Sequence, residues 1–294
     1  AAFGAVPLVL GWFPDPPNVV GGCTKLKAGG GRNKQLAVLA AMMAAASCAL
    51  TAVTLSNPNP LVKLGFAVSV STVLCIGAQV LLPAKIARCN LYMFLASASH
   101  VSLAGALDYF YTAPKDCVKD APHFSMTFYV TWSQLAGSFA SLMAVGIFQG
   151  CLQNWRLRPL FWVSTVVRCA AAAVDLLIVN RVNIQIGVPD KVAYMLGNNV
   201  AAAVAGQLDL MPAVVLTSKL CPPGMEATVY AILAGFQNFG GSVSAAVGSA
   251  LTSEFGIKAD LELDECTFDG LSGLIVLSHI ILPLLVVPLT FVLI

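Results

Sequence analysis

The stretch Gly206-Gln-Leu-Asp-Leu-Met-Pro-Ala-Val-Val-Leu-Thr-Ser-Lys-Leu-Cys-Pro-Pro-Gly-Met-Glu-Ala-Thr-Val-Tyr230 decides the fold of this chain. It joins two long apolar segments, residues 192–220 and 227–256, through a very short polar turn. A membrane-spanning helix needs about 20 apolar residues, so both segments are long enough to span. The first carries an acid, Asp209, well inside its apolar run. The stretch therefore predicts two antiparallel membrane helices, one of which holds a charge that lipid cannot solvate.

The turn between these segments carries signals that end one helix and start the next. Pro222 and Pro223 prevent helix continuation, and Gly224 permits the reversal of direction. Lys219 near the end of the first helix and Glu226 in the first turn of the second both complement the helix dipoles. We expect a tight cytoplasmic hinge, which either takes part in gating or only separates the two helices.

The composition indicates an integral membrane protein. Hydrophobic residues make up 58% of the chain and charged residues 10%, and the mean hydropathy is +0.82. A soluble domain carries about 25% charged residues. The expected fold is all-α, a polytopic helical bundle in contact with the lipid bilayer. The charges lie in short loops rather than in one basic patch, so nucleic acid is not an expected partner.

Eight segments are long enough to span a membrane. Residues 1–17 are too short and are interpreted as the tail of a truncated membrane helix, residues 18–34 as a Gly-rich cytoplasmic linker, and residues 35–294 as the transmembrane bundle. The expected spans lie near residues 36–56, 61–82, 86–109, 126–150, 157–180, 192–220, 227–256 and 271–294.

The orientation follows from the basic residues in alternate connections. The side that holds the linker 18–34 receives nine basic and two acidic residues, and the other side receives six basic and nine acidic residues. Because cytoplasmic loops carry an excess of Lys and Arg, we expect the linker and the loop that contains Arg156 to be cytoplasmic.

Five polar residues in or beside the apolar segments are candidates for binding or coupling: Asp209, Asp175, Gln207, Arg168 and Asp108. A charge at mid-membrane costs about 2.5–3.5 kcal/mol, so such residues usually have a function or a structural partner. Arg168 and Asp175 are seven residues apart, on one helix face but about 10 Å apart along the axis, which is a poor distance for direct pairing. Both interpretations, functional and structural, stay open for each residue.

Small residues also recur within the segments. Gly241-x-x-x-Ala245 and Ser244-x-x-x-Gly248 follow the pattern that brings membrane helices into close contact. We expect static packing at this face, with a sliding interface as the alternative.

No enzymatic constellation emerges from the sequence. Gly270-Leu-Ser272-Gly273 resembles the signature of intramembrane serine proteases, and His279 follows on the same helix. Seven helical residues place Ser272 and His279 about 10 Å apart, however, whereas proton transfer needs about 3 Å. His100 is interpreted as a hydrogen-bonded packing residue. Nine cysteines without a Cys-x-x-Cys pair do not indicate a zinc site, and no cofactor or metal is expected.

Four ordered motifs carry a family resemblance. They are Leu107-Asp-Tyr-Phe-Tyr-Thr-Ala113, Pro122-His-Phe-Ser-Met-Thr-Phe-Tyr-Val-Thr131, Gly187-Val-Pro-Asp-Lys-Val-Ala-Tyr194 and Leu220-Cys-Pro-Pro-Gly-Met-Glu-Ala-Thr-Val-Tyr-Ala-Ile-Leu-Ala-Gly-Phe-Gln-Asn-Phe-Gly240. In this order and spacing the chain resembles the C-terminal portion of the folate–biopterin transporter family, a branch of the major facilitator superfamily.

The resemblance implies a secondary transporter of folate, biopterin or related organic anions that works by alternating access, with a proton as the candidate coupling ion. It also implies a partner, the missing N-terminal helical bundle of the same protein. The alternatives are a transporter of another organic anion or nucleoside, and a non-transporting membrane subunit of the same fold. The membrane is left open between the plasma membrane and an organelle membrane, including that of a plastid.

The expected topology also pairs two cysteines. Cys117 and Cys266 are the cysteines of the two longer non-cytoplasmic loops, residues 112–125 and 254–269, where oxidising conditions favour a disulfide. Two unrelated free thiols are the alternative.

Overall fold

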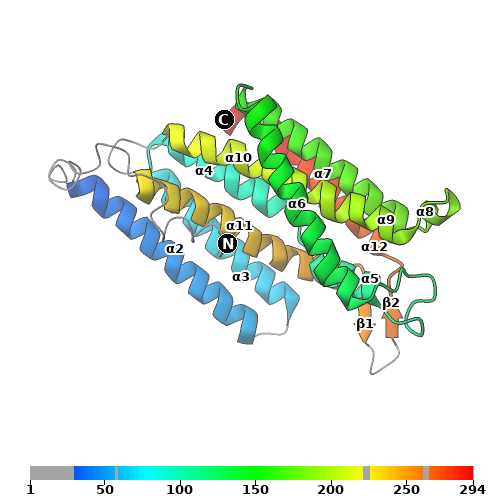
Figure 1. Cartoon of the computed structure of the whole chain (residues 1–294). Coiled ribbons are helices and arrows are strands. Elements are labelled where there is room, and N and C mark those ends of the chain that lie inside the picture. Colours follow the sequence, from blue (N-terminus) through cyan, green and yellow to red (C-terminus); the bar gives the residue numbers. More distant parts are fainter. Residues whose placement is uncertain (1–29, 57–58, 221–225, 261–264, 294) are drawn as a thin grey trace, which may run out of the picture.

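The computed structural model describes residues 30–56, 59–220, 226–260 and 265–293, which are almost entirely helical (Figure 1). The elements are α2 (Gly30–Ser56), α3 (Pro60–Leu81), α4 (Ala84–Ser99), α5 (Ala104–Thr112), η2 (Thr127–Trp132), α6 (Ser133–Ile147), η3 (Phe148–Leu152), α7 (Leu157–Val179), α8 (Val182–Gln185), α9 (Asp190–Tyr194), η4 (Met195–Ala201), α10 (Ala202–Leu220), α11 (Glu226–Glu254), β1 (Lys258–Asp260), β2 (Glu265–Thr267), α12 (Leu271–Ile275), η5 (Val276–Ile281), α13 (Leu282–Val286), η6 (Val287–Leu289) and α14 (Thr290–Leu293).

Several of these elements follow one another without a break. The π-helical turns η2, η3, η4 and η5 lie inside longer helices, so that η2–α6–η3, α9–η4–α10 and α12 to α14 each form one continuous rod. In the described residues, six helical stretches are long and apolar enough to cross a membrane. They are Lys34–Ser56, Pro60–Leu81, Thr127–Leu152, Leu157–Val179, Asp190–Leu216 and Leu271–Leu293.

The other two expected spans look different in the structure. The span predicted over 227–256 is α11, a helix of 29 residues whose Gln237, Asn238 and four glycines make it less apolar than the six. The span predicted over 86–109 is divided, because α4 ends at Ser99 and α5 begins at Ala104. The region of the expected span therefore consists of two helices rather than one.

Side chains from two other helices bond to three backbone groups in the break between α4 and α5. The Ser244 hydroxyl of α11 accepts a hydrogen bond from the Ser102 N–H (2.8 Å) and donates one to the His100 carbonyl (2.7 Å). Nε2 of His279 lies 3.0 Å from the Val101 carbonyl oxygen. Non-helical backbone at membrane depth is stable only when protein or a water-filled cavity surrounds it, and these contacts provide that surrounding.

The small residues of α11 allow α4 and the break that follows it to lie very close to α11. A Cβ added at Gly240 would lie 2.7 Å from the Phe94 carbonyl oxygen, and one added at Gly248 would overlap the Ser102 carbonyl. Of all helix pairs, α11 and α4 make the most extensive contact. The face that carries Gly240, Ser244 and Gly248 is thus a packing surface against the divided helix.

The helices form two groups around this contact. On one side α2 and α3 pack against each other and against α11, and on the other α6, α7 and α10 pack together (Figure 1). The rod α12 to α14 contacts both α4 and α7. Three clusters of buried apolar side chains correspond to this arrangement: one among α2, α3, α4 and α11, one at the end that holds α5 and α12, and one between α4, α7 and α10.

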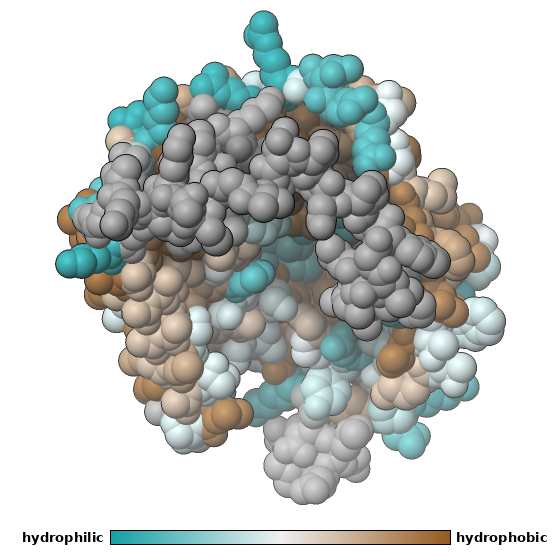
Figure 2. Space-filling view, turned by 60° about the vertical axis from the view of Figure 1, so that its left-hand side comes forward, coloured by the Kyte–Doolittle hydropathy of each residue, from teal (hydrophilic) through white to brown (hydrophobic). Residues whose placement is uncertain are grey.

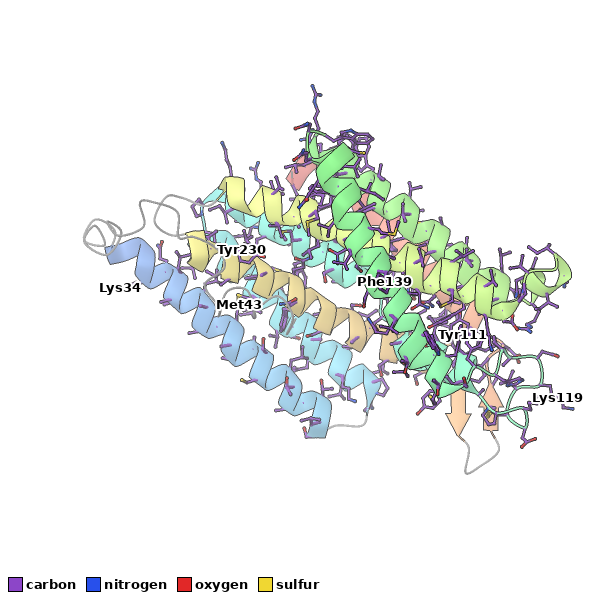
Figure 3. All side chains as sticks on the ribbon, in the orientation of Figure 1. Lys34, Met43, Tyr111, Lys119, Phe139 and Tyr230 are labelled. Carbon is purple, nitrogen blue, oxygen red and sulfur yellow. A yellow bond between two sulfur atoms is a disulfide. The ribbon has the colours of Figure 1, made fainter. Side chains whose placement is uncertain are left out.

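The two ends of the bundle differ. Figure 3 places Lys34 and Tyr230 at one end, and Tyr111 and Lys119 at the opposite end. At the latter end β1 pairs with β2 in antiparallel register, with Ala259 opposite Cys266. Cys117 and Cys266, the pair expected from the sequence, are joined here by a disulfide with Cα atoms 5.3 Å apart.

The flanks of the bundle are apolar. On α6, for example, Phe139, Leu142 and Met143 are each about two-thirds exposed, at 68%, 70% and 68%. Figure 2 shows hydrophobic residues over both flanks and hydrophilic residues along the upper edge. Such exposed apolar flanks are the surfaces that lipid covers in a membrane bundle.

Candidate functional site: a polar cavity between the helices

A cavity of about 320 Å³ lies where the two groups of helices meet. Its wall is formed by α4 and the break that follows it, by α7, α10 and α11, and by α13 with η6. Aromatic side chains form one part of the wall, where Tyr92 and Phe161 meet edge to face with ring centroids 5.2 Å apart. The rest combines polar side chains with apolar ones such as Met93, Pro283 and Val286, and a concave site with such a mixed lining is typical of small-molecule binding.

An ion pair forms the charged part of the cavity wall. Arg168 of α7 donates from Nε to Oδ2 of Asp209 of α10 at 2.6 Å, and Nη2 lies 2.5 Å from the same oxygen. Both side chains remain partly accessible, with exposed fractions of 21% and 29%. The partner of Arg168 is therefore on the neighbouring helix, which agrees with the poor spacing between Arg168 and Asp175 in the sequence. Gln207, two residues before Asp209, does not line the cavity.

Two histidines lie at the divided helix beside this pair. The rings of His100 and His279 have centroids 5.0 Å apart. His100 lines the cavity, and its Nδ1 is buried without a hydrogen-bond partner among the described residues. The interpretation of His100 as an ordinary hydrogen-bonded packing residue is therefore incomplete. The Ser244 hydroxyl, which also lines the cavity, is engaged by the Ser102 N–H and the His100 carbonyl.

Asp175 belongs to a second polar cluster, outside the cavity. Its Oδ1 accepts hydrogen bonds from the Tyr111 hydroxyl (2.9 Å) and from Nδ2 of Asn198 (3.1 Å), and the residue is only 4% exposed. Asp108 lies nearby on α5, where its Oδ1 accepts a hydrogen bond of 2.5 Å from the Tyr129 hydroxyl. The rings of Tyr111 and Tyr129, which bond to the two acids, have centroids 6.2 Å apart, so this cluster joins α5, η2, α7 and η4 near the end that holds the disulfide.

The same end contains a second ion pair. Arg181, in the left-handed backbone conformation with φ of 59°, makes two hydrogen bonds of 2.9 Å to the carboxylate of Asp190. Nδ2 of Asn183 also donates to Asp190 Oδ1 at 2.7 Å. Arg181 and Asn183 lie in the short connection between α7 and α9, and Asp190 is the first residue of α9, so their bonds hold that connection in shape.

The serine and histidine of the protease-like signature bond to other groups. The Ser272 hydroxyl donates to Oδ1 of Asn180 at 3.0 Å, and Nε2 of His279 contacts the Val101 carbonyl. Neither contact activates the serine as a nucleophile. In the described part of the chain, no three His, Cys, Asp or Glu side chains gather as metal ligands would.

The predicted hinge cannot be placed. Pro222, Pro223 and Gly224 lie outside the described residues, as do the side chains of Lys219 and Glu226. The role of these five residues as a gate or a plain turn stays a prediction.

Sequence reasoning missed several polar residues of both clusters. Asn198 bonds to Asp175, while Gln237 and Ser244 line the cavity. Each is an uncharged polar residue in a long apolar segment, and the search for charged residues passed over them. A search for every buried amide or hydroxyl in such segments would have found these residues, though not their partners.

The apolar rods, the divided helix and the internal cavity define a multi-pass helical integral membrane protein. A family model described as the BT1 family matches residues 26–294, and the chain belongs to that family. Among curated proteins, the chain is 34% identical over 153 residues to the folate-biopterin transporter of Synechocystis sp.. It is also 30% identical over 164 residues to the probable folate-biopterin transporter 2 of Arabidopsis thaliana, and 25% identical over 139 residues to folate transporter 2 of Plasmodium falciparum.

These matches cover 51%, 56% and 47% of this chain. They cover 30%, 32% and 29% of the three relatives, so the matched stretch of the chain spans about a third of their length. No solved structure matches.

Proposed function

We propose that this chain forms the substrate-binding half of a secondary transporter for folate, biopterin or related pterin anions. The observation that carries the proposal is the accessible ion pair between Arg168 and Asp209 in the wall of the cavity. Three relatives that bear folate or folate-biopterin transporter in their names support the choice of substrate.

The chemistry of the cavity wall suits such a substrate. A pterin ring presents a 2-amino group beside a ring N–H, and a carboxylate such as Asp209 accepts from both donors at once. The guanidinium of Arg168 matches a carboxylate, the group that ends the glutamate portion of a folate. Tyr92 and Phe161 provide aromatic surface against which a flat heterocycle can lie.

The ion pair itself gives a mechanism for exchange. In the structure the two side chains neutralise each other, which avoids an unpaired charge between the helices. A substrate that has both a donor edge and an anionic group can take over both halves of this ion pair. Its donor edge would bond to Asp209 in place of Arg168, and its anionic group would bond to Arg168 in place of Asp209. Protonation of Asp209 frees Arg168 in the same way, so this acid is the residue we assign to a coupling proton.

A cavity of about 320 Å³ is at the lower end of the range of ligand pockets, about 300–1,000 Å³. We infer that a second, N-terminal bundle of the same protein completes the site, since the curated relatives are about three times as long as the matched region. Two bundles that rock about a site near the midplane form an alternating-access transporter of the major-facilitator type.

The test is uptake and exchange of labelled folate by the full-length protein in vesicles, with wild type, Asp209→Asn and Arg168→Gln at equal membrane levels. Loss of a charge-assisted hydrogen bond should weaken substrate affinity about 10- to 100-fold. Asp190→Asn is the matched control, since it breaks the other ion pair at the end of the bundle and should leave affinity near that of wild type.

The outcomes separate the roles. If Asp209→Asn abolishes accumulation but keeps exchange, the acid binds the coupling proton, and if it weakens both, the acid binds the pterin edge. Unchanged uptake in both cavity variants would contradict the proposal. If the protein transports a nucleoside and Arg168 is not needed for that transport, the chain belongs to a transporter of another substrate. If the wild-type protein transports nothing, the chain is part of a non-transporting membrane subunit.

A further inference from the structure

A second cavity, of about 460 Å³, opens at the end of the bundle opposite the disulfide. It lies between the first turns of α4 and α7, the C-terminal part of α10 and the residues of α14. By the charge bias of the loops this end is cytoplasmic, at the level where lipid headgroups meet the ends of the spans.

Three cations line this cavity: Lys85 and Arg88 from the first turns of α4, and Arg158 from the first turn of α7. No acid lines the cavity in the described part of the chain, and none of the three belongs to either of the ion pairs found there. Three positive charges that converge without an acid repel one another, so an anion among them stabilises the arrangement.

The position of the three cations at helix N-termini also favours a bound anion. The N-cap residues of α4 and α7, Pro83 and Arg156, make no side-chain cap hydrogen bond. The positive ends of these two helix dipoles lie within a few residues of the three cations and add to the positive potential there. Arg158 is also held in place, because its guanidinium carbon lies 5.9 Å from the centroid of the Phe291 ring.

The rest of the wall is apolar and continues onto the lipid-facing surface. Leu216 and Leu293 line the cavity, and so do Phe291 and Val292, which are 60% and 70% exposed. A soluble anion would gain nothing from these side chains. A lipid would, because its acyl chain could run along them while its phosphate meets the cations.

We propose that this cavity binds the phosphate group of an anionic phospholipid at the cytoplasmic face, with Lys85, Arg88 and Arg158 on the headgroup and Phe291 and Val292 along the acyl chain. The site is separate from the Arg168–Asp209 cavity, because the two share no lining residue. Basic pockets between membrane helices on the cytoplasmic side are typical lipid-headgroup sites.

The experiment uses the purified full-length protein in detergent and titrates phosphatidylglycerol, phosphatidylcholine or inorganic phosphate while thermal unfolding is followed. At about 100 times the dissociation constant, phosphatidylglycerol should raise the Tm of the wild type by on the order of 5 °C. Phosphatidylcholine and phosphate should produce much smaller shifts. A phosphate shift equal to that of phosphatidylglycerol would overturn the lipid assignment.

Arg88→Ala/Arg158→Ala should lower the apparent affinity for phosphatidylglycerol about 30-fold, since each basic residue near the surface contributes about a factor of five. The matched control is Lys34→Ala/Arg156→Ala, which removes two exposed cations that do not line the cavity. If the control variant loses as much affinity for phosphatidylglycerol as Arg88→Ala/Arg158→Ala, the loss reflects the general surface charge, and the proposal is contradicted.

A second measurement protects the test if the alanine variant does not fold. Photoactivatable phosphatidylglycerol should label the wild type at the peptides that contain Cys89 and Phe291, both of which line the cavity. Arg88→Lys/Arg158→Lys, which keeps both charges, should retain this labelling. Labelling spread evenly over the apolar flanks would refute a specific site.

Discussion

Ser244→Ala tests how the divided helix is held. In the structure this 3%-exposed residue bonds to both sides of the break, since its hydroxyl accepts from the Ser102 N–H at 2.8 Å and donates to the His100 carbonyl at 2.7 Å. Alanine removes both bonds and leaves two backbone groups without that partner.

The expected loss can be worked out from these two bonds. Hydrogen bonds between membrane helices are worth on average about 0.6 kcal/mol, so two give at least about 1 kcal/mol. A buried and unsatisfied donor or acceptor costs about 1–3 kcal/mol, which would raise the total to about 4 kcal/mol. Since Ser102 and Ser244 line the cavity, water can reach part of the break, and we expect about 2 kcal/mol.

The assay is thermal unfolding of the purified full-length protein, followed by tryptophan fluorescence in one detergent. Ser242→Ala is the matched control on the same helix, because its hydroxyl is exposed and bonds only within its own turn, to the Asn238 carbonyl. The control should stay within about 0.5 kcal/mol of wild type. Equal stability of the two variants would refute the view that Ser244 holds the break.

Three further predictions concern packing, covalent structure and orientation. Gly248→Ala should lower the free energy of unfolding by about 1–3 kcal/mol, because the added Cβ would overlap the Ser102 carbonyl. Gly146→Ala, which has open space around it, should raise the free energy of unfolding slightly. An unchanged free energy of unfolding for Gly248→Ala in the same assay would contradict the close contact. Reduction of the Cys117–Cys266 disulfide, which closes a separation of 149 residues, should cost about 2–4 kcal/mol, and the effect should be absent in Cys117→Ser/Cys266→Ser. Single cysteines at Lys119 and Arg156 should react with an impermeant label from opposite sides of sealed vesicles, and labelling from one side would overturn the topology.

Part of the site could be predicted from the sequence. A charge in an apolar segment is costly in lipid, so Arg168 and Asp209 of the cavity were identified without a structure, as was Asp175 of the second polar cluster. Their partners were not, since a helix of known sequence can rotate to face any neighbour. Packing alone pairs Arg168 with Asp209 and turns Asp175 toward Tyr111.

The division of α4 from α5 shows the same limit. Residues 86–109 are apolar along their whole length, and length alone predicts one continuous helix. The helix stops at Ser99 because Ser244 and His279, which lie more than 140 residues further along the chain, provide hydrogen bonds that replace those of the helix.

The sequence by itself determined the class of this protein, a multi-pass helical membrane protein, whereas of the eight expected spans six are long and apolar enough to cross a membrane in the described residues. It could do so because burial in lipid depends on composition and length, which are local properties. Tertiary structure alone decided which charges meet, where the cavities lie and where a helix breaks. These depend on atoms from distant segments that come within a few ångströms of each other, and no single segment specifies that approach.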